Sequence, residues 1–185
     1  MKLNSGPVTE CRYTIPADGS QKRREIAVTA SAAGKTSAPA SLTAVLGDAL
    51  GLPFSMTPTP EEATLFTPFD ANGDGSTFFL GQDEMTMEPL FCIYTVNGDA
   101  DDWLFLPALG LADRDRLYNL AFRLRSVTPY ESRENLEVVV ASMPDPSGVV
   151  ASIMRLDGAG MSEETLRNVR FAVPQGGSWY IGFHC

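Results

Sequence analysis

The segment FDANGDGSTFF, residues 69–79, has the residue types and spacing that best suit the binding of a metal ion. Asp70, Asn72 and Asp74 stand at alternate positions, and two glycines let the backbone turn tightly around them. Ca²⁺ prefers hard oxygen ligands, and the three residues match positions 1, 3 and 5 of a D-x-[DN]-x-[DN]-G loop. The spacing predicts a calcium site. The alternative is an Asx-rich turn, in which these side chains bond their own backbone.

This loop is not predicted to be an EF-hand. Position 12, where an EF-hand places a bidentate Glu, is Gly81 here, and the flanking residues do not favour helices. The remaining possibility is a site in a β-sandwich, completed by backbone carbonyls or a distant carboxylate, with an affinity of about 10⁻⁴–10⁻³ M. The acidic segment NGDADD, residues 97–102, could join such a shell, although an acidic turn before Trp103 is favoured.

The other candidates for chemistry do not predict an enzyme. His184 is the only histidine, and no G-x-S-x-G segment supplies a nucleophile for it, so a structural role is favoured. The GKT within residues 32–37 lacks the first glycine of a phosphate-binding loop. Cys11, Cys92 and Cys185 form no CxxC pair. Small buried apolar residues are the favoured interpretation, and one disulfide plus a free thiol is the alternative.

Three aromatic residues offer a possible sugar-binding surface. Trp103, Trp179 and Tyr180 could form a platform on which a sugar ring stacks. Both tryptophans fall on apolar faces of predicted strands, so packing in the core is favoured for them. Tyr180 has more freedom to be exposed. The aromatic residues alone therefore do not predict a glycan site.

Composition limits the partners that the chain can have. The 185 residues carry a formal net charge of −9, with eleven Arg and only three Lys. Proteins that bind nucleic acid present a basic stripe with interleaved aromatics, and this chain has none, so no nucleic-acid partner is predicted. No run of about 18 apolar residues occurs, so no membrane span is predicted. The length fits one or two domains.

Short alternating segments indicate an all-β fold. In residues 117–127, Leu120, Phe122 and Leu124 stand on one face and polar or small residues on the other. Similar strands are predicted within residues 24–32, 33–45, 134–143, 169–174 and 178–185, and turn residues lie between them. Residues 162–169 are the single helical candidate. Residues 47–66, rich in Pro and Gly, read as a linker or a lead-in strand. The pattern predicts an antiparallel β-sandwich.

Four segments of the second part resemble one family of domains. FTPFDANGDGSTFF, DADDWLFLPALGL, LYNLAFRLRS and VPQGGSWYIGFHC follow each other in the same order and spacing as in bacterial cleaved-adhesin, or choice-of-anchor J, domains. Those domains are concanavalin-like jelly rolls, and some of them bind calcium. The resemblance spans roughly residues 52–185. It implies an antiparallel jelly-roll β-sandwich over residues 47–185 and supports calcium as the ion held by the loop at residues 70–74.

The first part is similar to the closing strands of a fibronectin type III module. REIAVTASAAGKTSAPASLTAV resembles the penultimate strand, turn and last strand of that fold. Such a module needs more residues than the first 46, and the family of the second part continues with a further strand of the type LxLDDI, which this sequence lacks. We therefore expect a partial fibronectin type III-like segment at 1–46. We also expect a jelly roll at 47–185 without its last strand, as in a chain shortened at both ends.

The resemblance implies a non-catalytic extracellular module for adhesion or binding, part of a multidomain bacterial surface or secreted protein. Its partners would be a host protein or a glycan, together with neighbouring domains of the parent chain. The alternative is a carbohydrate-binding module that accompanies a glycan-degrading enzyme. A hydrolase that uses the acidic clusters has no motif behind it.

Overall fold

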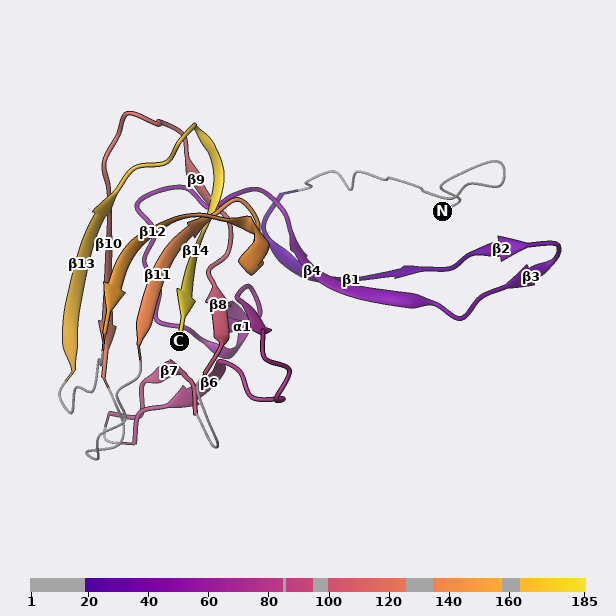
Figure 1. Cartoon of the computed structure of the whole chain (residues 1–185), viewed down its shortest axis with the longest axis horizontal. Helices are drawn as coiled ribbons and strands as arrows, with labels where there is room; N and C mark the ends of the chain where they lie inside the picture. The colour runs from indigo at the N-terminus through magenta and orange to yellow at the C-terminus, as the bar shows by residue number, and fades with distance from the viewer. Residues whose placement is uncertain (1–18, 85, 95–99, 126–134, 158–163) are drawn as a thin grey trace. The chain divides into compact units, whose positions relative to one another are not determined.

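The computed structural model describes residues 19–84, 86–94, 100–125, 135–157 and 164–185 (Figure 1). These residues form fourteen β-strands, one α-helix of four residues and one short 3₁₀ turn. Every paired strand is antiparallel to its neighbour. The all-β class predicted from the alternation of apolar residues is therefore confirmed.

The chain divides into two compact units, residues 1–48 and 49–185. In the first unit, β1 (Lys22–Val28) and β4 (Ala40–Leu46) pair along seven residues. The short strands β2 (Ser31–Ala32) and β3 (Lys35–Thr36) extend this ribbon to a tight turn. The two turn residues, Ala33 and Gly34, both have positive φ, which matches the right-handed twist of the strands they connect. The likeness of this unit to a fibronectin module stays a prediction.

One large sheet dominates the second unit. Its strand order is β12-β11-β14-β8-β5, and β9 pairs with the first part of β14. The strands are β5 (Thr67–Asp70), β8 (Asp102–Phe105), β9 (Leu109–Leu111), β11 (Leu136–Ala141), β12 (Val149–Leu156) and β14 (Gly177–His184). Strands distant in sequence thus become neighbours, which brings the start of β8 beside the end of β5.

A second layer covers one face of this sheet. It consists of β10 (Tyr118–Leu124) and β13 (Thr165–Phe171), paired over seven residues. Phe122 of β10 meets Phe183 of β14 edge to face, with ring centroids 5.0 Å apart. The two sheets share one buried cluster, made of Leu109, Leu111, Tyr118, Val138, Val140, Phe171, Val173, Trp179 and Ile181. This cluster is the core of a β-sandwich, because the inner faces of both sheets supply it.

The opposite face of the large sheet is also covered near β8. Trp103, Phe105, Val139 and Ala141 form a second buried cluster, with Phe69 among the residues packed against it. Strand β8 is therefore buried on both faces, which explains why its sequence is continuously apolar after Asp102. The hairpin of β6 (Phe79–Gln82) and β7 (Pro89–Cys92) adds Phe91, whose ring lies 4.5 Å from that of Phe66.

Two local predictions were wrong. Residues 164–169 do not form a helix, because they belong mostly to β13, where pairing with β10 buries Phe171 and half-buries Val169. Residues 162 and 163 lie outside the described residues. A helical turn, α1 (Pro60–Ala63), instead occurs within the Pro-rich stretch predicted as a linker or a strand. In the part of the chain that the structure describes, no helix is long and apolar enough to cross a membrane.

Helix α1 depends on a capping box. The Thr59 hydroxyl accepts a hydrogen bond from the Glu62 backbone N–H, and the Glu62 carboxylate accepts one from the Thr59 N–H. We expect Thr59→Ala to lower the free energy of unfolding by about 1 kcal/mol, because the Glu62 N–H loses its acceptor and the Glu62 carboxylate loses the hydrogen bond from the Thr59 hydroxyl. Urea unfolding followed by tryptophan fluorescence measures this loss. Thr59→Ser keeps the hydroxyl and should leave stability nearly unchanged; equal losses in both variants would contradict this role of the cap.

Candidate functional site

The loop after β5 is organised by its own side chains. The Asp70 carboxylate accepts hydrogen bonds from the backbone N–H groups of Gly73 (2.6 Å) and Gly75 (2.9 Å). Asn72 Oδ1 accepts one from the Asp74 N–H at 3.0 Å. Both glycines have positive φ, 74° and 84°, a conformation that L side chains rarely adopt. The three predicted residues therefore lie together on one tight, Asx-rich loop.

Strand pairing places another carboxylate beside this loop. Asp102, the first residue of β8, stands directly opposite Asp70 in the register of β5 and β8. Opposed residues of an antiparallel pair share one face of the sheet, with Cβ atoms about 5 Å apart. The Asp102 backbone is fixed on its other side by two hydrogen bonds with the backbone of Cys185, at 3.1 and 3.2 Å. The register thus sets two carboxylates on the same face, next to the loop.

Asp102 is the unusual member of this group. It is only 2% exposed, and its Oδ1 atom is buried without a hydrogen-bond partner among the described residues. Burial raises the pKa of this carboxyl, and the nearby charges of Asp70, Asp74 and Asp101 raise it further, whereas His184 acts in the opposite direction. A buried carboxylate that has one oxygen without a partner and lies among other carboxylates is costly unless a cation or a proton neutralises it.

The chemistry of these donors fits calcium. Asp70, Asn72, Asp74 and Asp102 offer carboxylate and amide oxygens only, the hard ligands of that ion. The loop contains a further buried oxygen without a partner among the described residues, the hydroxyl of Thr77. No group of three or more His, Cys, Asp or Glu side chains in the described ranges is already gathered as a metal site. The Asn72 amide oxygen and backbone carbonyls, which are not among those side chains, would have to complete the calcium coordination shell.

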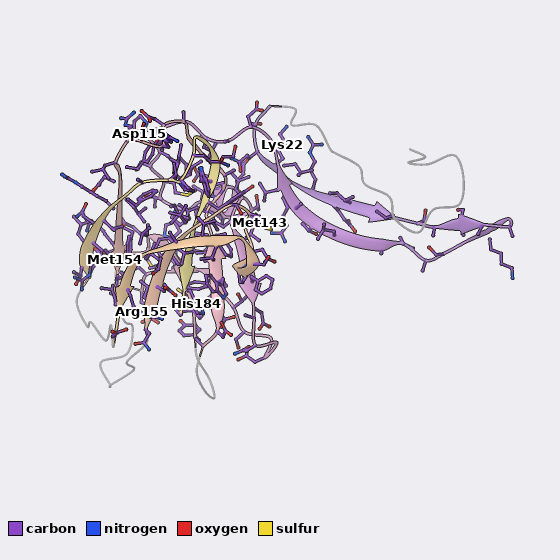
Figure 2. All side chains as sticks on the ribbon, turned by 45° about the horizontal axis from the view of Figure 1, so that its top comes forward. Lys22, Asp115, Met143, Met154, Arg155 and His184 are labelled. Atoms are coloured by element: carbon purple, nitrogen blue, oxygen red, sulfur yellow. The ribbon has the colours of Figure 1, made fainter. Side chains whose placement is uncertain are left out.

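His184 lies beside the candidate site and contacts two carboxylates and the ring of Trp103. Its Nε2 atom lies 2.9 Å from Asp101 Oδ1, and its ring stacks on Trp103 with centroids 3.9 Å apart. Its Nδ1 atom is 3.8 Å from the carboxylate of Glu137, which also stands opposite Arg155 in the pairing of β11 with β12. Figure 2 labels His184 and Arg155. Both ring nitrogens therefore face carboxylates. This arrangement supports the structural role favoured for His184 from the sequence.

The two tryptophans pack in the core, as the sequence favours, and do not form a platform on the surface. Trp103 and Trp179 are buried, at 8% and 5% exposure, and the Trp179 indole donates to the Gln175 carbonyl at 2.9 Å. Tyr180 is half-buried, and this burial raises the pKa of its hydroxyl. Cys92 is a half-buried free thiol whose pKa is raised mainly by burial. Cys185 is likewise half-buried, and Cys11 lies outside the described residues.

The sequence predicts the loop at residues 70–74 as a candidate metal site more clearly than it predicts Asp102 as a part of that site. From the sequence, segment 97–102 could join a metal shell, and an acidic turn is the favoured interpretation. Residues 95–99 lie outside the described residues, but Asp102 itself belongs to strand β8 and is buried. The available signal was its position directly before the apolar run of Trp103 to Phe105. A charged residue that continues a buried strand needs a partner.

Comparisons with known proteins find distant likenesses. No family model matches the chain, and no curated protein matches it. The K1 cleaved adhesin domain of Lys-gingipain from Porphyromonas gingivalis W83 is similar in structure at 16% identity, covering 64% of this chain and 79% of that domain, with a TM-score of 0.44. The K3 cleaved adhesin domain of the same protein is similar at 14% identity, covering 65% and 79%, with a TM-score of 0.45.

Proposed function

We propose that residues 49–185 form a non-catalytic, extracellular adhesion or binding module, and that the end of its sheet is fixed by a calcium ion. The observation that carries the calcium part is the buried Asp102 carboxylate beside the loop of Asp70, Asn72 and Asp74. The four adhesin-like segments of the sequence support the adhesion part. The parent protein would be a bacterial surface or secreted protein with further domains.

Each side chain has a distinct role in the proposed site. Asp70 and Asp102 come from adjacent strands, so ligation by both would hold the ends of β5 and β8 together. Asn72 and Asp74 would supply oxygens from the loop. A bound cation contributes positive charge that offsets the mutual repulsion of these carboxylates. Sites with few charged ligands bind calcium in the millimolar range typical of extracellular modules, which agrees with a role outside the cell.

The alternative, a carbohydrate-binding module, has one observation in its favour. Phe79 and Tyr94 are exposed to 41% and 56%, and their rings lie 5.3 Å apart at 43°. Exposed aromatic faces can stack on sugar rings, which the buried Trp103 and Trp179 cannot do. We take this exposed pair as the candidate glycan contact of the alternative function.

One experiment separates these two functions. The fluorescently labelled chain is applied to immobilised extracellular-matrix proteins and to a glycan array, in millimolar calcium and in chelator. An adhesion module that recognises proteins should bind the matrix proteins in calcium, lose that binding in chelator, and keep it in a Phe79→Ala, Tyr94→Ala variant. Glycan binding that this variant abolishes would instead support the carbohydrate-binding alternative. Binding to neither surface would contradict both functions.

A further inference from the structure

The ribbon of β1 and β4 has two long edges that no described strand covers. Its two strands form a sheet of their own, side by side in Figure 1. Isolated two-stranded ribbons are marginally stable in water, and an exposed edge presents a row of backbone groups ready to pair with another strand. The ribbon therefore has a physical reason to acquire a third and a fourth strand.

The two faces of the ribbon differ in character. Ile26 and Val28 of β1 stand opposite Leu42 and Ala40 of β4 on one face. Ala44 and Leu46 of β4 continue that face, where they stand opposite Arg24 and Lys22 of β1. Val28 and Leu42 are 51% and 64% exposed, which is high for apolar side chains within strands. The opposite face carries polar pairs such as Glu25 with Thr43. A strand that joins this ribbon must keep the apolar residues on the same side, because a one-residue slip would reverse the faces.

The two edges of the ribbon differ in charge, and this difference makes the edge of β4 the one that can pair with another strand. The sequence of β1, KRREIAV, has four charged residues, and charged side chains on an edge oppose pairing with another strand. The sequence of β4, ASLTAVL, has no charge and no proline that would oppose pairing along its edge. The edge of β4 therefore lacks the charged side chains that discourage another strand from pairing with the edge of β1.

We propose that the partner of β4 is β4 of a second copy of this chain, in an antiparallel pair centred on Thr43. Registers that keep the faces matched place even-numbered residues opposite even-numbered ones. Among these, only the register centred on Thr43 pairs all seven residues of the strand. It sets Leu42 of one copy opposite Ala44 of the other, and Ala40 opposite Leu46, so each large side chain meets a small one. Thr43 meets its own equivalent, a favourable cross-strand pair.

The product is a four-stranded sheet in the order β1-β4-β4-β1, in which the apolar residues of the two β4 strands form a central stripe on one face, next to Ile26 and Val28 of each β1 strand. No like charges meet across the new junction, because β4 carries none. The charged β1 strands become the outer edges of the sheet, where their side chains discourage further addition. The assembly therefore closes as a dimer instead of growing into a filament.

Sedimentation equilibrium and thiol crosslinking of the full chain test this pairing. We expect the mass to approach twice that of the single chain as the concentration rises. In the proposed register, Thr43→Cys places two thiols opposite each other, so a short thiol-reactive crosslinker should give a covalent dimer at high yield. Ser41→Cys is the matched control: it is exposed on the same face of the same strand, but it stands opposite Val45 of the other copy.

The crosslinking yields and the mass in solution together show whether the chain forms a dimer and whether Thr43 lies at its centre. A crosslinking yield several-fold higher for Thr43→Cys than for Ser41→Cys or the parent chain would support the register, as would crosslinking in a mixture of Ser41→Cys and Val45→Cys chains. A single-chain mass at every concentration would overturn the proposal. A dimer in which Thr43→Cys crosslinks no better than Ser41→Cys would overturn it as well, since the interface would then lie elsewhere.

Discussion

Replacing Phe105 by alanine is expected to lower the free energy of unfolding of the second unit by about 3–5 kcal/mol, the usual effect of removing a buried aromatic side chain. Phe105 is fully buried, at 0% exposure, and its ring lies parallel to that of Trp103 with centroids 5.7 Å apart. It stands opposite Gly182 on β14, where a Cβ atom would come within 2.6 Å of the ring. The Phe105 ring fills the space that the absence of a side chain at Gly182 leaves, so removing the ring creates a cavity.

Urea unfolding followed by tryptophan fluorescence measures this effect in the second unit alone, because both tryptophans, Trp103 and Trp179, lie there. Phe105→Leu is the matched control and should cost clearly less, because it retains most of the apolar volume. A loss below about 1 kcal/mol for Phe105→Ala would mean that β8 is not packed on both faces as described.

Calcium is expected to stabilise the second unit, and Asp102 is expected to be required for it. With an affinity of about 10⁻⁴–10⁻³ M, calcium at 10 mM would raise the free energy of unfolding by about 1.4–2.7 kcal/mol. Asp102→Asn should abolish this gain, because it removes the buried charge that favours the ion. In chelator the same variant should be more stable than the wild type, since the amide does not carry the cost of an unpaired buried carboxylate.

The dependence on pH follows from the raised pKa of Asp102. In chelator, the folded state binds the Asp102 proton more tightly than the unfolded state, whose pKa is about 3.9. The contribution of this group to stability is therefore full below about pH 3.9 and is lost as the pH rises through the higher folded pKa. The difference in stability between Asp102→Asn and the wild type should grow over that range and become constant above it.

Asp115→Asn is the control for a simple change of net charge. Its side chain is 85% exposed and lies in the connection between β9 and β10 (Figure 2). It should leave both the calcium response and the stability in chelator unchanged. If Asp102→Asn and Asp115→Asn behave alike, the stabilisation by calcium is non-specific and the proposed role of Asp102 is wrong.

The sequence predicted the strands best where one face is buried and the other is not. In β10 the period of two is clear, because Leu120 and Phe122 face the core and Asn119 and Arg123 face solvent. The same period in β14 correctly separated Trp179 and Ile181 from His184. In β10 only one face is buried; in β14 the other face packs Tyr180 against the second buried cluster, and the alternation is carried by Trp179 and Ile181.

Prediction was poorest where a distant strand supplies the environment. Residues 165–169 resemble a short helix in isolation, and only pairing with β10 makes them a strand. In the same way, the loop at Asp70 and the acidic segment at 97–102 are both visible in the sequence, but the pairing of Asp102 with Asp70 is not. The register of β5 against β8, which joins them, depends on packing around Phe69 and Trp103 that no local pattern encodes.

Calorimetric titration of the full chain with calcium tests the central claim most directly, using the wild type, Asp102→Asn and Asp115→Asn side by side. The proposed site predicts binding of one ion with an affinity of about 10⁻⁴–10⁻³ M by the wild type and by Asp115→Asn, and no binding by Asp102→Asn. A wild-type chain that binds no calcium would contradict the site, and so would an Asp102→Asn chain that binds it as tightly as the wild type.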